Sequence, residues 1–350
     1  MDVLKACLLL TLVGCGTPGY LIEQGMGQLK LQWRGEKNEK LLANPNVAED
    51  VKFKIRLIGD AKQFFAYHFG IKVGGIYSKT TQLDGKAVSW LVIASRPTQV
   101  EAHEFQFPFV GGFPYIGFFD KADAEDFRRD MEEDGFVTHL RPVYAYSTLG
   151  LLEDRILSSF FHFKDVELVE LIFHELFHVA FFAKDDVELN ENLAQWFANA
   201  LLDEYFKDAG MLAAYRRKQA LEKELEKKLV ALAHLLREEF AKMRPYLTDE
   251  AANAHARRFA AEILVPVVQE ACRAGGWSGD DCPDRVEKWN QARLAALLTY
   301  EEEQDFIAAL VQRHGWDTRG FLIALKTYHA EWKKNGKGDF STFLREKALP

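Results

Sequence analysis

The sequence has few cysteines, no excess of basic residues and, after its first residues, no apolar run long enough to cross a bilayer. Its 44 Lys and Arg stand against 52 Asp and Glu without a basic patch, which argues against nucleic acid as a partner. The missing apolar run excludes a membrane-spanning helix in the body of the chain. What is present, 350 residues of which 48% are hydrophobic, suits one large globular unit or two closely joined ones.

The start of the chain has the pattern of a targeting segment. Lys5 is the only basic side chain before an apolar run at residues 6–13, which has the length of a signal h-region. The run ends in Leu12-Val13-Gly14-Cys15, which resembles the lipobox of bacterial lipoproteins and implies cleavage before Cys15 and a lipid on its sulfur. An ordinary secretory signal or a buried N-terminal helix is the alternative. Because Gly16 and not aspartate follows, we expect an anchor on the periplasmic side of the bacterial cell envelope, in the outer membrane.

The four cysteines support export. Cys7 would leave with the signal peptide and Cys15 would carry the lipid, which leaves Cys272 and Cys282. These two flank a glycine-rich stretch, and no histidine lies near them in the sequence, which disfavours a metal role. In an oxidising compartment they predict a disulfide.

The most informative stretch is His174-Glu175-Leu176-Phe177-His178, a His-Glu-x-x-His motif inside an apolar run. On a helix the two histidines project from one face about a turn apart, where each can bind the same zinc ion through a ring nitrogen. Glu175 can then reach a water on that metal and act as its base. A chance match is the alternative, but without a metal these groups would be costly buried polar side chains. The motif predicts a zinc hydrolase and favours a peptidase.

A catalytic zinc site takes three protein ligands and keeps a fourth position open. Asn190 is a good N-cap for a helix with apolar residues at helical spacing, which places Glu191 in the first turn, pointing inward. Glu191 is therefore the predicted third ligand. Glu188, in the loop before that cap, is the alternative ligand, and a role of Glu191 as a mere partner of the helix dipole is another.

Other side chains are candidates for supporting roles. Glu167 and Glu170 lie on the ligand face of the motif helix, and one of them could accept the second ring N–H of a ligand histidine. Tyr300 could stabilise the oxyanion of a tetrahedral intermediate, with a core tyrosine as the alternative. Asn290 and Tyr144 could face the cleft, although Tyr144 could equally be a polar strand end.

The predicted fold is α+β and predominantly helical, with a zincin-like motif helix beside a small sheet and a helical C-terminal part. We expect a signal peptide at residues 1–15, a zinc peptidase core at 16–206, and a helical part at 207–350 that completes the same unit. The expected helices are 18–42, 47–69, 120–134, 210–243, 249–271, 283–300, 303–313, 318–332 and 340–347, and the expected strands are 87–94, 115–119 and 137–145.

These residues together resemble the predicted aminopeptidase family of bacterial lipoproteins, which are zinc peptidases of the His-Glu-x-x-His…Glu type. The resemblance covers most of the chain and includes a departure at Phe177 and another at Asn192, where small residues are more usual. Besides the lipobox, it is carried by residues 20–29, 107–111, 115–119, 145–150, 174–178, 190–191 and 289–300.

We therefore expect a lipid-anchored zinc metallopeptidase, with aminopeptidase activity as the resemblance implies. Zn²⁺ on His174, His178 and Glu191 would activate a water, and Glu175 would take its proton and pass it to the leaving amine. Exo- and endo-cleavage both stay open, because no carboxylate is marked as the group that holds a substrate amine.

The alternative is an envelope lipoprotein with a structural or vestigial zinc site that acts as a binding module. The intact Glu175 argues against it, since a structural site has no use for that glutamate. The expected partners are a peptide substrate and, through the lipid on Cys15, the membrane; the oligomeric state is left open.

Overall fold

The computed structural model describes residues 26–27, 29–31, 33–107, 111–145, 154–184, 186–279, 282–298, 304–335 and 338–348. Its α-helices are α3 (Asn38–Ala43), α4 (Glu49–Phe69), α5 (Lys121–Glu133), α6 (Asp165–Ala180), α7 (Val187–Tyr205), α8 (Ala209–Met243), α9 (Asp249–Phe259), α10 (Val265–Gly275), α11 (Gln291–Leu298), α12 (Gln304–His314), α13 (Thr318–Asn335) and α14 (Phe340–Ala348). Short helical turns are η1 (Ser158–His162), η2 (Ala260–Leu264, a π-turn) and η4 (Val286–Lys288). The strands are β1 (Glu36–Lys37), β2 (Lys79–Thr81), β3 (Ser89–Ser95), β4 (Phe105–Phe107), β5 (Gly111–Phe113), β6 (Ile116–Phe118), β7 (Val137–Val143) and β8 (Ile156–Leu157).

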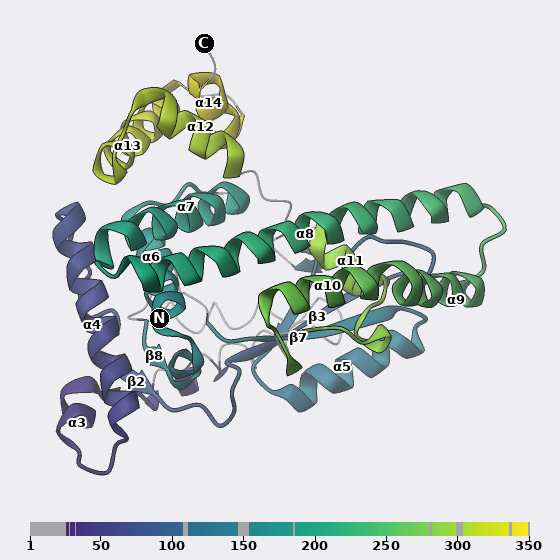
Figure 1. Ribbon diagram of the computed structural model, residues 1–350, viewed down its shortest axis with the longest axis horizontal. Helices are drawn as coiled ribbons and strands as arrows, with labels where there is room; N and C mark the ends of the chain where they lie inside the picture. The colour runs from purple at the N-terminus through teal and green to yellow at the C-terminus, as the bar shows by residue number, and fades with distance from the viewer. Residues whose placement is uncertain are drawn as a thin grey trace, which may run out of the picture.

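This architecture confirms the prediction of a predominantly helical α+β fold (Figure 1). The described strands form three small sheets, in the orders β1-β2-β8, β6-β3-β7 and β4-β5. No helix in the described part of the chain combines the length and the apolar character needed to cross a membrane.

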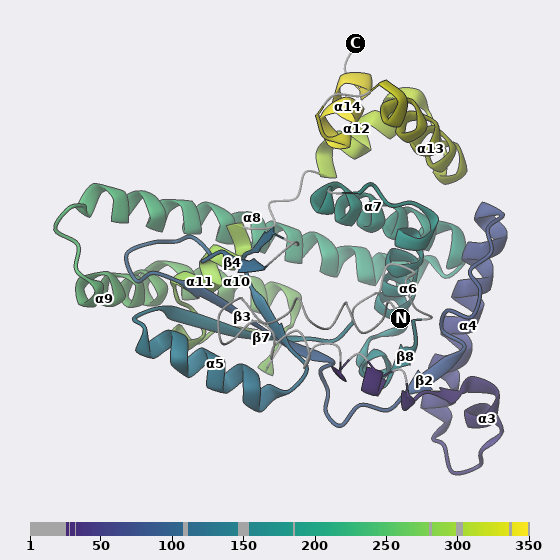
Figure 2. The same ribbon diagram turned by 180° about the vertical axis from the view of Figure 1, so that it is seen from behind.

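The predicted strand–helix–strand unit is confirmed in β6, α5 and β7. β3 lies between β6 and β7 and pairs antiparallel with both, with Trp90 opposite Phe118 and Pro142. Asp120 caps α5 by accepting a 2.8 Å hydrogen bond from the backbone N–H of Ala122. Gly135 follows the helix at φ 81°, a conformation that favours glycine. α5 and α11 both pack against this sheet, as Figure 2 shows from behind.

The main hydrophobic core lies around the motif helix. α6 packs between α4 and α7, and α12, α13 and α14 add side chains to the same core. Phe65, Phe173, Phe197 and Phe321, from four different helices, are fully buried in it. Each such ring contributes roughly 1.5–3 kcal/mol by leaving water. The C-terminal helices therefore pack directly on the elements that carry the motif.

The sheet that shares this core with α6 is β1-β2-β8, not the predicted one. Ile156 and Leu157 of β8 are buried in the main core, and η1 leads from them directly into α6. The sheet of β3, β6 and β7 has a separate small core, which includes Val92 and Phe118. No sequence pattern predicts β1, β2 and β8, because strands of two or three residues are too short to show alternation.

α8 connects two hydrophobic cores. Its first turns contact α6 beside the main core, and its second half packs against α9, α10 and α11 (Figure 1). Leu236 and Phe240 of α8 are buried there with Val268 of α10. The prediction of one long helix that packs by one apolar face is confirmed.

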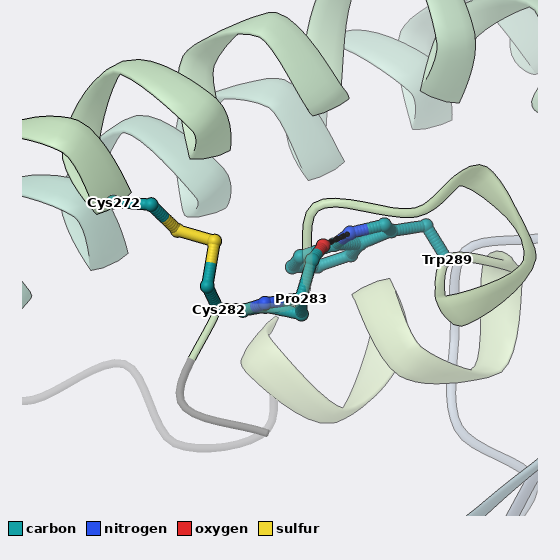
Figure 3. Close-up of a disulfide and its surroundings, with 4 residues drawn as sticks. All are labelled: Cys272, Cys282, Pro283 and Trp289. Atoms are coloured by element: carbon teal, nitrogen blue, oxygen red, sulfur yellow. Dashed lines mark hydrogen bonds between the residues drawn. A yellow bond between two sulfur atoms is a disulfide. The ribbon is translucent and has the colours of Figure 1, made fainter. Parts of the chain in front are cut away.

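The second core contains the predicted disulfide. Cys272 of α10 is bonded to Cys282, with 5.8 Å between their Cα atoms (Figure 3). The indole N–H of Trp289 donates a 2.7 Å hydrogen bond to the carbonyl of Pro283, directly after the second cysteine. The predicted helix over 283–300 is shorter, because η4 and an extended turn precede α11.

Candidate metal centre

The motif helix α6 is held by its apolar face. Ile172, Phe173, Leu176 and Phe177 are fully buried in the main core, so the opposite face, with His174, turns toward the start of α7. The ring of Phe177 stacks on that of Phe197, with 4.3 Å between their centroids. The bulky residue at 177 is thus a packing contact between α6 and α7.

α7 begins earlier than the sequence predicted. The side chain of Asp186 caps it by accepting from the backbone N–H of Leu189, and the predicted cap, Asn190, lies inside the helix. Asn190 is buried, and its amide accepts from the N–H of Ala183 (2.8 Å) and donates to the carbonyls of Ala183 and Asp186 (2.7 Å each). The prediction that Asn190 caps the helix was wrong. Its amide, which both donates and accepts, instead forms hydrogen bonds with the backbone of the preceding turn.

Because α7 begins at Val187, the two candidate carboxylates lie at other positions in the helix than predicted. Glu188 lies in the first turn of α7 and is exposed, and Glu191 lies in the second turn. Nε2 of His174 is 3.2 Å from Oε2 of Glu191, and Nε2 of His178 is 3.4 Å from Oε1 of the same carboxylate. The two Nε2 atoms are 3.3 Å apart. The structure thus brings His174, His178 and Glu191 together and leaves Glu188 outside the cluster.

The donor atoms fit one zinc ion. Four ligands in a tetrahedron, each about 2.0–2.1 Å from zinc, have their donor atoms roughly 3.3–3.5 Å apart. The two Nε2 atoms, 3.3 Å apart, agree with that geometry, and each of them lies 3.2–3.4 Å from a different oxygen of the Glu191 carboxylate. His178 is almost fully buried, and its Nδ1 atom has no hydrogen-bond partner within the described residues. Two imidazoles and one carboxylate are also the ligand types that hydrolytic zinc sites use.

The pKa values of the two histidines are shifted in opposite directions. Burial lowers the pKa of His174, but the hydrogen bond to Glu191 and the charges of Glu175, Glu191 and Glu170 outweigh it, so the net pKa is raised. Burial and the neighbouring His174 lower the pKa of His178 to about 4. Although burial raises the pKa of Glu191, its hydrogen bond to His174 and the nearby histidine charges bring it below its ordinary value. At neutral pH His178 and Glu191 are therefore already in the protonation states of metal ligands.

Tyr77 is a neighbour of the motif that sequence reasoning missed. It is buried, although it is a large residue with φ 56°, in the left-handed region that normally costs a non-glycine residue energy. Its N–H donates to the carbonyl of Asp154 (2.7 Å), and its carbonyl accepts from Asn38 (2.9 Å). Burial raises its pKa, and the charges of Glu175 and Asp154 raise it further, so its hydroxyl stays neutral. No sequence pattern marks such a backbone conformation.

Glu170 has a different role from the one predicted. It does not hydrogen-bond to a ligand histidine; its carboxylate accepts from Gln195 of α7 (2.8 Å) and from Gln219 of α8 (2.9 Å). The hydroxyl of Tyr215 donates to its other oxygen. Glu167 accepts from Lys218 of α8 in the same region. These side chains join α6, α7 and α8 next to the cluster.

Of the remaining predicted residues, two lie within the described part of the chain and two lie outside it. Asn290 does not face the cluster: it donates to the carbonyl of Thr138 (2.8 Å) and accepts from the N–H of Arg293, at the start of α11. Tyr144 is exposed, and its ring lies edge-on to Phe163 just before α6. Cys15 and Tyr300 lie outside the described residues, and their roles stay predictions.

Fold and site together define a helix-rich α+β protein with a candidate metal centre between two adjacent helices. The chain belongs to the family described as "Putative aminopeptidase", which it matches over residues 19–337. No curated protein and no solved structure matches it. The match extends from before the first described residue into the C-terminal helices, and it confirms the predicted family at the level of a peptidase.

Proposed function

We propose that this protein is a lipid-anchored zinc metallopeptidase that acts as an aminopeptidase. The observation that carries the proposal is the close approach of three candidate ligands: the Nε2 atoms of His174 and His178 are 3.3 Å apart, and the carboxylate of Glu191 lies within 3.4 Å of both. Family membership supports peptide bonds as the target. Zinc on these side chains would supply a Lewis acid with an open fourth position, as in hydrolytic zinc sites.

Glu175 is the proposed general base. It follows His174 directly on α6, is half-buried, and its charge helps to raise the pKa of His174. In this role Glu175 takes the proton from the attacking water and delivers it to the leaving amine. Tyr77, kept neutral by burial and by the charge of Glu175, would keep its hydroxyl proton and could donate it in a hydrogen bond.

Glu175→Gln is the decisive variant. We expect it to bind zinc as the wild type does, near one per chain, and to hydrolyse peptides about 10²–10⁴-fold more slowly, the usual contribution of a general base. Zinc content by mass spectrometry and initial rates on aminoacyl-coumarin amides measure the two effects separately. Full activity in this variant would remove the proposed base.

The aminopeptidase part is tested by blocking the substrate amine. We expect free peptides to be hydrolysed and the same peptides with acetylated N-termini to resist. Equal cleavage of both would make the protein an endopeptidase.

Unfolding on removal of zinc by EDTA would identify a structural metal, whereas loss of turnover with the fold retained supports a catalytic one.

The lipid anchor is supported by Leu12-Val13-Gly14-Cys15 alone. We expect the intact mass of the protein purified from bacterial membranes to show a cleaved chain with acyl groups on Cys15. Cys15→Ser is expected to lose them and to leave hydrolysis unchanged. A wild-type chain without acyl groups would contradict the anchor and leave the peptidase proposal untouched.

A further inference from the structure

The first described residues leave three large apolar side chains uncovered. Residues 26, 27, 29–31 and 33 are helical, and Met26, Leu29 and Trp33 are 65%, 52% and 83% exposed. At about 100° per residue, these three positions fall within an arc of roughly 60°. They therefore form one strip along the helix, which we call the apolar strip.

The other side of this helix is fixed to the protein. A Cβ atom on Gly27 would lie 2.2 Å from the ring of Phe119, so only glycine permits that approach. The carbonyl of Leu31 accepts from the hydroxyl of Thr81 (3.0 Å), and Arg34 donates to both carboxylate oxygens of Asp84 (2.8 Å each). These contacts set the rotation of the helix, so the apolar strip faces away from the protein surface.

The position of the strip in the chain indicates what covers it. Met26 is eleven residues after Cys15 (26 minus 15), so a lipid on that cysteine is at most about 40 Å away along a fully extended chain. Lys30, at the edge of the strip, has a largely exposed side chain with a 3.5 Å ion pair to Asp84. Tryptophan and aliphatic residues beside a lysine are typical of helices that lie in the interface of a bilayer with anionic lipids.

We propose that Met26, Leu29 and Trp33 lie in the interface of the bilayer that holds the lipid on Cys15. The protein then has two membrane contacts, an acyl anchor and a helix face, and the second contact fixes its orientation on the surface. This inference rests on the lipid anchor of the proposed function but not on its peptidase activity.

The first test measures where Trp33 lies. The full-length lipidated protein is reconstituted into vesicles of phosphatidylethanolamine and phosphatidylglycerol, with a spin label near the glycerol end of some acyl chains. The emission of wild type minus that of Trp33→Phe isolates Trp33 from the other six tryptophans of the seven. We expect the spin label to quench more than about half of this difference emission and aqueous acrylamide to leave it largely unchanged. Quenching by acrylamide alone, or by neither agent because the chain itself covers Trp33, would overturn the inference.

The second test measures attachment. We expect Leu29→Gln with Trp33→Gln to transfer from donor to acceptor vesicles at least about tenfold faster than the wild type. Ile323→Gln is the matched control, because Ile323 of α13 is 66% exposed but lies outside the strip. Equal transfer rates of the double variant and the wild type would overturn the inference. So would an intact mass without acyl groups on Cys15, whereas peptide hydrolysis is measured separately and does not depend on either result.

Discussion

Gln195 of α7 donates a 2.8 Å hydrogen bond to Glu170 of α6, and this bond joins the two helices one turn away from the candidate metal centre. Gln195 lies one turn after Glu191, and Glu170 lies one turn before His174. The bond therefore holds the ligand helix α7 in register with the motif helix. Gln219 and Tyr215 of α8 complete the contacts of the Glu170 carboxylate.

Replacing Glu170 by alanine is expected to destabilise the protein. The change removes the acceptor of three half-buried donors, from Gln195, Gln219 and Tyr215, and each donor left unpaired costs about 1–3 kcal/mol. Gln219 keeps a second acceptor in Asn199, so two donors lose their partner. We expect the free energy of unfolding in urea to fall by roughly 2 kcal/mol or more. Glu167→Ala is the control on the same face, since it loses the ion pair with Lys218 and an exposed hydrogen bond from the N–H of Lys164, and it should cost about 1 kcal/mol. Equal losses in the two variants would contradict a special role of Glu170.

Glu191 and Glu188 provide a matched pair for the metal proposal. Both lie in the first two turns of α7, but only Glu191 has its carboxylate within the cluster. We expect Glu191→Ala to weaken zinc binding by more than about 100-fold, beyond the effect typical of outer-shell residues. Glu188→Ala should bind zinc as the wild type does. Competition with a chelator of known affinity measures both constants, and a comparable loss in Glu188→Ala would invalidate the assignment of Glu191 as third ligand.

Much of the site could be predicted because its chemistry is local in the sequence. His174, Glu175 and His178 share one helix, so helical spacing predicts that the two histidines lie on one face. Glu191 lies in the second turn of the next helix, close enough in the sequence to be recognised as a candidate ligand. The exact start of α7 could not be predicted, because Asp186 and Asn190 are both residue types that cap helices. The hydrogen bonds between Asn190 and the backbone of Ala183, which distinguish the two, are not visible in the sequence.

The long-range contacts around the site had no local signal. The charge of Glu175 acts on Tyr77, in the loop after α4, and Gln219 of α8 donates a hydrogen bond to Glu170. Neither residue belongs to a periodic pattern or a motif that names its partner. The same holds for the sheet of β1, β2 and β8, whose strands meet only because the main core brings distant segments together.

His139 is expected to make stability depend on pH. Burial and the nearby positive charges of Arg293 and Arg141 lower its pKa from 6.5 to about 4. Between pH 4 and 6.5 the unfolded chain therefore binds a proton that the folded protein does not, and stability falls as the pH drops through this window. The loss amounts to about 3 kcal/mol at pH 4, and none is expected above pH 7.

His139→Gln removes this titration and isolates it from all others. Between pH 7 and pH 4, we expect the unfolding free energy of the wild type to fall by about 3 kcal/mol more than that of the variant. Urea unfolding at a series of pH values measures the difference. Parallel stability curves for the two proteins would show that His139 titrates normally in the fold.

The Cys272–Cys282 disulfide is expected to stabilise the protein without affecting the metal centre. It closes a loop with a sequence separation of 10 residues, and such short loops contribute about 2–3 kcal/mol by restricting the unfolded chain. Both cysteines lie in the second core with α9 and α10, whereas His174 and Glu191 lie on helices of the main core. Replacement of both cysteines by serine should therefore lower the unfolding free energy by that amount and leave the zinc affinity unchanged.

Reduction of the wild type should have the same effect as the double variant. A loss of zinc affinity in both would mean that the two cores, which α8 joins, are coupled strongly enough for the second core to position the ligands.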